Sequence, residues 1–190
     1  IIGFLASVSL SAQTAEEYLN SVIGKMKSYD DISIVCNVTN IQKDEYTDSS
    51  ISSNGFASIK GNSYIMNMDG QEMVCNGEIL WTHLIYDEEV MVSEATEDSS
   101  PIFIIDTFKE NTTMSFVESN DIDIKTIEIK GNEDEIFEKI QISIDKNNLT
   151  VKKVHVFINH DVYSEELIYE ITDFKTNQNL PDNMFIFDEN

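Results

Sequence analysis

The sequence predicts a mainly β (α+β) fold, in which a strongly curved antiparallel sheet forms a half-open β-barrel. Short apolar runs with a period of two follow one another from residue 31 onward, and pairs such as Gly-Asn, Asp-Gly and Asn-Gly separate several of them. Such pairs are typical of tight hairpin turns, so consecutive strands should be neighbours. Two other segments have the apolar pattern of helices. We therefore expect an N-terminal amphipathic helix and a short apolar helix that forms a lid over the concave side.

The first thirteen residues, IIGFLASVSLSAQ, carry no charge and end in small residues. This pattern is typical of the apolar and cleavage regions of a secretory signal peptide and is too short to span a bilayer. We interpret residues 1–13 as the remnant of such a peptide and residues 14–190 as a single domain, which we expect to be exported and soluble. A buried N-terminal segment is the alternative.

The first helix is expected at residues 14–29. Thr14 and Glu17 form a capping-box pattern, and Lys25 and Lys27 lie near the end where the helix dipole favours cations. Seven apolar residues recur at helical spacing and form one stripe, so this face must pack on another element. They are Ala15, Tyr18, Leu19, Val22, Ile23, Met26 and Tyr29.

A meander of strands is expected to follow. A first strand begins at Ile32, and the polar stretch 43–54 is expected to form a hairpin tip or loop. Further short strands are expected at 55–60, 63–68, 71–76, 79–86 and 88–94.

The run 79–86 contains the only tryptophan and is bulky at almost every position. We expect Ile79 and Trp81 to face the concavity and Leu80, Leu84 and Tyr86 to face the other side. Because both faces are apolar, the pattern leaves the reverse assignment open.

The lid helix is expected near residues 100–109, where Pro101 occupies a favourable first helical position. Its sequence is apolar around most of the circumference, which is typical of a helix that is buried on several sides or lies across an apolar opening. Strands resume near Ile127, and Phe185 and Phe187 fit one last edge strand.

Charge and motifs narrow the function classes. Twelve lysines, no arginine and 35 acidic residues give a formal net charge of −23, which disfavours binding to nucleic acids and to anionic membranes. The excess of acidic residues is explained by solubility or, alternatively, by binding to a basic patch on a partner. The spacing of the three histidines indicates no zinc site, and no nucleophile or phosphate-loop motif is present. We therefore expect no enzyme activity, no cofactor and no metal. Cys36 and Cys75 are expected either as buried free thiols or as a pair.

Three segments in order resemble the bacterial outer-membrane lipoprotein carrier proteins, the LolA-like family: AEEYLNSVIGKMKSYDDISI, GFASIKGNSYIMNMDGQEMVCNGEILWTHLIYDEEVMV and SPIFIIDTF. The resemblance covers about residues 14–110, and a matching strand pattern continues to the Leu-Pro and Phe-x-Phe finish. It implies a helix-lidded half-open barrel whose apolar cavity binds lipoprotein acyl chains. It also implies a periplasmic carrier, without a cofactor, that receives lipoproteins from an inner-membrane ABC-type release complex and delivers them to an outer-membrane acceptor.

The alternative is a secreted or periplasmic lipid-binding or structural module of the same fold without transfer activity. In either case we expect a monomer. Family members commonly carry Arg-Pro where this chain has Lys60-Gly61, and that arginine is associated with holding the lid. Lys60 is not an equivalent donor. The residues expected to line the lipid-binding cavity are Tyr64, Met66, Met68, Trp81, Ile102, Ile105, Phe108, Val156, Ile158 and Tyr169.

Overall fold

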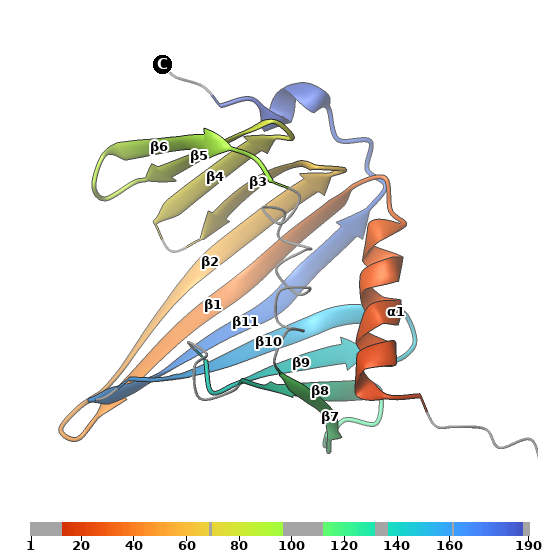
Figure 1. The fold of residues 1–190 in the computed structure, drawn as a ribbon, viewed down its shortest axis with the longest axis vertical. Coiled ribbons are helices and arrows are strands. Elements are labelled where there is room, and N and C mark those ends of the chain that lie inside the picture. The colour runs from red at the N-terminus through yellow and green to blue at the C-terminus, as the bar shows by residue number, and fades with distance from the viewer. Residues whose placement is uncertain (1–12, 69, 97–111, 132–136, 161, 188–190) are drawn as a thin grey trace, which may run out of the picture.

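One antiparallel sheet, which has eleven strands among the described residues, dominates the fold (Figure 1). The computed structural model describes residues 13–68, 70–96, 112–131, 137–160 and 162–187. The strand order is β6-β5-β4-β3-β2-β1-β11-β10-β9-β8-β7, so the chain forms two meanders that join where β1 pairs with β11. The strands are β1 Ile32–Asp44, β2 Asp48–Lys60, β3 Ser63–Met68, β4 Gln71–Asn76, β5 Ile79–Leu84, β6 Glu89–Glu94, β7 Thr113–Val117, β8 Ile124–Lys130, β9 Lys139–Asp145, β10 Thr150–Asn159 and β11 Tyr163–Thr176.

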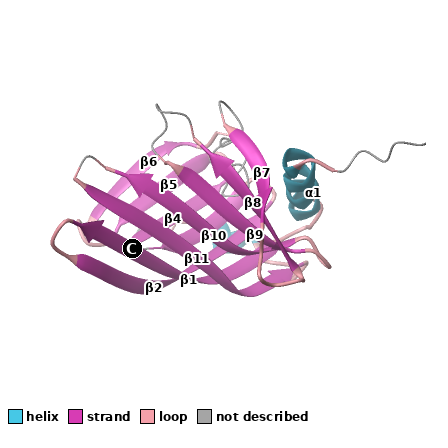
Figure 2. Cartoon of the chain, turned by 90° about the horizontal axis from the view of Figure 1, so that it is seen from below, coloured by secondary structure: helices cyan, strands magenta, loops and turns pink. Residues whose placement is uncertain are grey.

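The sheet is curved and its two outer strands, β6 and β7, do not pair with each other (Figure 2). The predicted mainly β fold with a curved, open antiparallel sheet is therefore confirmed. The lid helix expected at 100–109 lies outside the described residues, and so do Ile102, Ile105 and Phe108.

Helix α1, Ala15–Lys27, packs on one face of the sheet, which we call the inner face. Thr14 accepts a hydrogen bond from the Glu17 N–H, and the Glu17 side chain accepts one from the Thr14 N–H, so the predicted capping box is present. Leu19 and Val22 are fully buried against the inner-face isoleucines of β8 and β9. These isoleucines are Ile127, Ile129, Ile140, Ile142 and Ile144.

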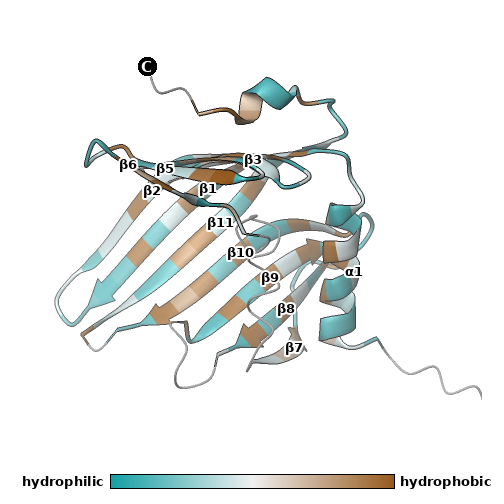
Figure 3. Cartoon of the chain, turned by 45° about the horizontal axis from the view of Figure 1, so that its top comes forward, coloured by the Kyte–Doolittle hydropathy of each residue, from teal (hydrophilic) through white to brown (hydrophobic). Residues whose placement is uncertain are grey.

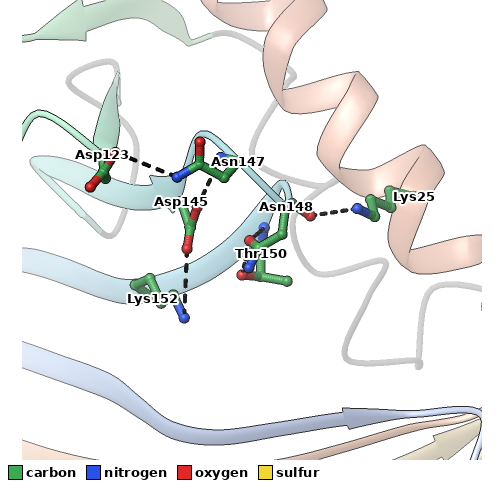
Figure 4. A network of polar contacts seen from close by, with 7 residues as sticks. All are labelled: Lys25, Asp123, Asp145, Asn147, Asn148, Thr150 and Lys152. Atoms are coloured by element: carbon green, nitrogen blue, oxygen red, sulfur yellow. Dashed lines mark hydrogen bonds and ion pairs between the residues drawn. The ribbon is translucent and has the colours of Figure 1, made fainter.

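The C-terminal half of α1 is tied to the turn between β9 and β10 (Figure 4). Lys25 Nζ donates to the Asn148 carbonyl over 2.6 Å. Within the turn, the Asn147 N–H donates to Asp145 Oδ1, and Asn147 Nδ2 lies 3.4 Å from Asp123 Oδ1. Apolar packing and this polar contact together fix the helix at the β7–β9 end of the sheet.

Of the two alternatives expected for the polar stretch 43–54, the structure shows the hairpin tip, and the tip is shorter than the polar stretch. β1 runs to Asp44 and β2 begins at Asp48, so only three residues form the turn. Asp44 accepts hydrogen bonds from the backbone N–H groups of Tyr46 and Thr47, which closes the turn. Backbone pairing with β2 and β11 on its two sides holds the end of β1 extended although Lys43 and Asp44 are polar.

The C-terminal segment differs from the expected edge strand. Asp182–Phe185 forms a short 3₁₀ helix, η2, that lies against β3 and β4 with Phe185 buried. Phe187 stacks on Trp81 with ring centroids 5.9 Å apart and planes 8° apart. Figure 3 shows this segment on one side of β3–β6 and α1 on the other. We call the side covered by η2 the outer face.

Candidate functional site

The strand register defines which side chains share the inner face near β3. Ile59 of β2 pairs with Tyr64, and Ala57 pairs with Met66. Because Ile59 and Ala57 belong to the face packed toward α1 and successive side chains alternate, Tyr64, Met66 and Met68 all lie on the inner face. Three of the ten predicted cavity residues are thus brought together on one strand.

A row of methionines crosses this part of the inner face. Met66 pairs with Met73 of β4, Met73 pairs with Thr82, and Thr82 pairs with Met91 of β6. Met66 and Met73 are half-buried and pack against the core. Methionine is flexible and polarizable, so a row of this kind can adapt to apolar ligands of different shape. The sequence analysis missed Met73 and Met91 because the row appears only in the cross-strand register.

Gly55 makes room for Met68. A Cβ on Gly55 would lie 2.9 Å from Met68 Cγ, which is too close, and 3.1 Å from Cys36 Sγ, which is a tight contact. The missing side chain therefore lets Met68 lie across β2 and over Cys36. Both Cys36 and Cys75 are free and buried, and burial raises the pKa of the Cys36 thiol. Buried thiols of this kind are inert packing residues.

Tyr64 is a fully buried member of the group, with 0% of its surface exposed. Burial, with a smaller contribution from Cys75, raises the pKa of the Tyr64 hydroxyl to about 12. Among the described residues the hydroxyl has no hydrogen-bond partner. The Tyr64 hydroxyl therefore stays neutral at physiological pH, and the side chain is buried beside Cys75.

A second group of predicted residues lies across β1 on the same face. Tyr169 of β11 pairs with Val38 and Val154, and Val156 pairs with Leu167. Val156 and Ile158 pack against the core while remaining half-buried. The sequence analysis did not single out Val154 and Phe174, which are also half-buried there. Figure 3 shows apolar and polar positions alternating along these strands.

Trp81 lies on the outer face, opposite to its expected side. Val74 pairs with Trp81 and Cys75 pairs with Leu80. Cys75 pairs with Tyr64 and therefore lies on the inner face, as does its other partner Leu80. The next residue, Trp81, faces outward, where it stacks on Phe187. The reverse assignment that the pattern left open is the one observed.

Lys60 binds the C-terminal segment. Its Nζ donates to the Leu180 carbonyl over 2.7 Å and to Asp182 Oδ1 over 2.5 Å. Asp31, which is 2% exposed, accepts hydrogen bonds from the N–H groups of Gln178 and Leu180. Burial alone would raise the pKa of the Asp31 carboxyl, but these backbone hydrogen bonds outweigh it and hold the pKa below its usual value.

The histidines all lie near carboxylates. His155 Nε2 is 2.9 Å from Glu166, whose pKa is lowered chiefly by its hydrogen bond from Lys43. His160 Nε2 is 3.4 Å from Glu165. Within the described ranges, no group of three or more His, Cys, Asp or Glu residues is placed to hold a metal ion. Both histidine–carboxylate pairs link residues of neighbouring strand segments.

The family model of the outer membrane lipoprotein carrier protein LolA matches residues 55–188. The chain belongs to the LolA family. The matched range includes both inner-face groups and the C-terminal segment. No curated protein matches the chain. No helix among the described residues of this LolA family member is long and apolar enough to cross a membrane.

One solved structure shares the fold of this LolA family member at low sequence identity, and two others align with it at lower TM-scores. An uncharacterized conserved protein from Thermus thermophilus aligns with a TM-score of 0.57 and 10% identity, over 92% of this chain and 94% of that one. A LolA superfamily protein from Nitrosomonas europaea aligns with a TM-score of 0.40 and 16% identity, over 93% and 99%. A putative outer membrane lipoprotein-sorting protein domain from Vibrio parahaemolyticus gives 0.41 and 12%, over 89% and 94%.

Proposed function

We propose that this protein is a periplasmic carrier that binds acyl chains on the inner face and shuttles lipoproteins from the inner to the outer membrane. It would act without catalysis or a cofactor. The observation that carries the proposal is the half-buried apolar inner face, in which Met66 and Met73 on one side and Val156 and Ile158 on the other pack only partly against the core. A face of this kind loses water when an acyl chain covers it, which favours binding.

The chemistry of the two groups supports acyl chains over polar ligands. Both consist of aliphatic, thioether and aromatic side chains, and Tyr64 in the first group stays neutral at any physiological pH. Each CH₂ removed from water contributes about 0.8 kcal/mol, which corresponds to roughly a fourfold change in affinity. Affinity should therefore rise steeply with acyl length until the inner face is covered.

The direct experiment measures uptake of an acylated peptide by the purified protein, with native mass spectrometry of protein taken from cells. We expect Val156→Glu to weaken uptake at least about tenfold, because the bound chain would have to pack against a charge. Val162→Glu is the matched control, since Val162 is exposed and lies outside both groups.

Equal uptake by the two variants would contradict binding on the inner face. A protein that takes up no acylated peptide or lipid and is extracted empty would instead fit a structural module of the same fold.

Transfer has its own test, in which loaded protein is mixed with membranes that contain an outer-membrane acceptor. Retention of the peptide there would contradict the carrier role while leaving lipid binding intact.

A further inference from the structure

Strand β6 is an exposed outer strand of the sheet. It pairs with β5 and with no other described strand. All six of its residues are exposed, including the consecutive apolar residues Val90, Met91 and Val92, at 41%, 49% and 62%. Proteins usually protect such an edge with lysine, proline or a bulge. β6 has no lysine or proline, and its register with β5 is unbroken.

The register also identifies which backbone groups of β6 are available. The Ala95 N–H donates to the Glu78 carbonyl over 2.8 Å, so this pair is a hydrogen-bonded pair. Such pairs alternate along an antiparallel ladder, and Ser93, Met91 and Glu89 therefore bond to β5. The intervening residues Val90, Val92 and Glu94 direct their N–H and C=O groups away from the sheet.

The outer face next to this edge is apolar. Trp81 pairs directly with Val92, and Phe187 stacks on the Trp81 ring. Val90 lies two residues from Val92 on the same face. A strand added beyond β6 would place alternate side chains beside Val92 and Val90. It would thereby extend an apolar strip that begins at buried Val74.

The charge around β6 indicates what kind of partner strand could pair with it. Asp87, Glu88 and Glu89 precede the apolar residues and Glu94 follows them. A second copy added to this edge would bring these acids together between two chains that each carry a formal charge of −23. An extended segment with basic residues at both ends would pair with them instead.

We propose that β6 is a docking edge for a partner protein. The partner would add an extended segment with alternating apolar residues, flanked by lysine or arginine, as a further strand of the sheet. The apolar contacts with Val90, Val92 and Trp81 lie on the outer face, opposite to the inner face that is proposed to bind acyl chains. Trp81 is then part of the docking surface.

The experiment uses a synthetic peptide, Lys-Lys-Val-Thr-Val-Thr-Val-Lys-Lys, with calorimetry and the fluorescence of the single tryptophan as readouts. We expect binding that weakens as salt rises, and a change in Trp81 emission. Val92→Pro removes an N–H that faces away from β5, so the sheet ladder remains complete. It should weaken peptide binding at least about tenfold while acyl uptake is unchanged. Val92→Thr keeps the N–H and should bind nearly as wild type.

A second variant keeps the proposal testable if the proline variant does not fold. Glu89→Lys combined with Glu94→Lys should reverse the preference, so that a peptide with glutamates at its ends binds better than the lysine peptide. Equal binding of both peptides by the wild type would overturn the proposal. So would full binding by Val92→Pro, or a dimer of the free protein that the same proline variant abolishes, since the edge would then serve a second copy.

Discussion

The two ends of the sheet differ in which face is sealed. At the β8–β9 end, α1 covers the inner face, and the isoleucines beneath it are 0–1% exposed. At the β3–β6 end, the C-terminal segment covers the outer face, while Met66, Met73 and Leu80 remain half-buried on the inner face. One end is built for stability, and the other exposes apolar surface that a ligand can cover.

The largest expected effect tests where stability resides. Leu19 is fully buried in the core beneath α1, so Leu19→Ala should lower the free energy of unfolding by about 2–5 kcal/mol. Leu84→Ala, on the half-buried inner face of β5, should cost roughly 1 kcal/mol. Urea denaturation measures both. Equal costs at the two sites would remove the distinction between the ends.

A smaller effect concerns the fit at Gly55. Gly55→Ala should cost about 1–3 kcal/mol, because the new methyl group displaces Met68 or Cys36. The methyl NMR signal of Met68 should shift. In a Met68→Ala background the cost should fall, and a double-mutant cycle measures the difference. Strictly additive effects would show that Met68 does not depend on the space at Gly55.

At the β8–β9 end of the sheet, a substitution of Gly24 should have the opposite effect on stability to that of Gly55→Ala. It lies within α1, and a Cβ there would have no neighbour within 4 Å. Gly24→Ala should raise the free energy of unfolding by about 0.5–1 kcal/mol, because alanine restricts the unfolded chain. Thermal denaturation at fixed pH measures the change. A loss of stability would indicate a contact of α1 that its exposed side does not suggest.

The smallest expected effect concerns the attachment of the C-terminal segment to the outer face. The pKa of Asp31 is lower in the folded protein than its usual 3.8, so its stabilising hydrogen bonds are complete above pH 3.8. They are lost as the pH falls below that value through the folded pKa. Trp81 emission should therefore stay constant from pH 7 to about 4 and change below it, as Phe187 leaves the ring.

Asp31→Asn is the corresponding variant. It should show altered Trp81 emission already at neutral pH, with the circular dichroism of the sheet retained. Wild-type emission in this variant would mean that other contacts, such as Lys60 with Asp182, suffice to hold the segment.

The regions predicted well from the sequence are those where local chemistry decides the structure. β3 and β4 have the expected bounds because tight turns flank short alternating runs. The capping box at Thr14 was likewise predictable. The placement of Tyr64, Met66 and Met68 on one face follows from alternation alone.

The structure differs from the sequence predictions where contacts with residues distant in the sequence determine the local conformation. The polar stretch 43–54 leaves a hairpin tip and a loop open, but β1 extends to Asp44, where Asn40 and Lys43 contact Glu165 and Glu166 of β11, more than a hundred residues away. Phe185 was expected in a strand, yet Asp31 and Lys60 hold its segment against the outer face. Trp81 lies in a run that is bulky on both faces, so only the register of β4 with β5 could assign its side.

The pairing of β1 with β11 has a consequence for how the chain reaches this fold. β1 is complete by residue 44, but its neighbour begins only at Tyr163. The middle of the sheet therefore cannot form until most of the polypeptide has emerged, and until then β1 has one unsatisfied edge. Such non-local closure makes folding slow, because a long loop must be ordered before the contact forms. We therefore expect the pairing of β1 with β11 to be a late step of folding, after hairpins between consecutive strands have formed.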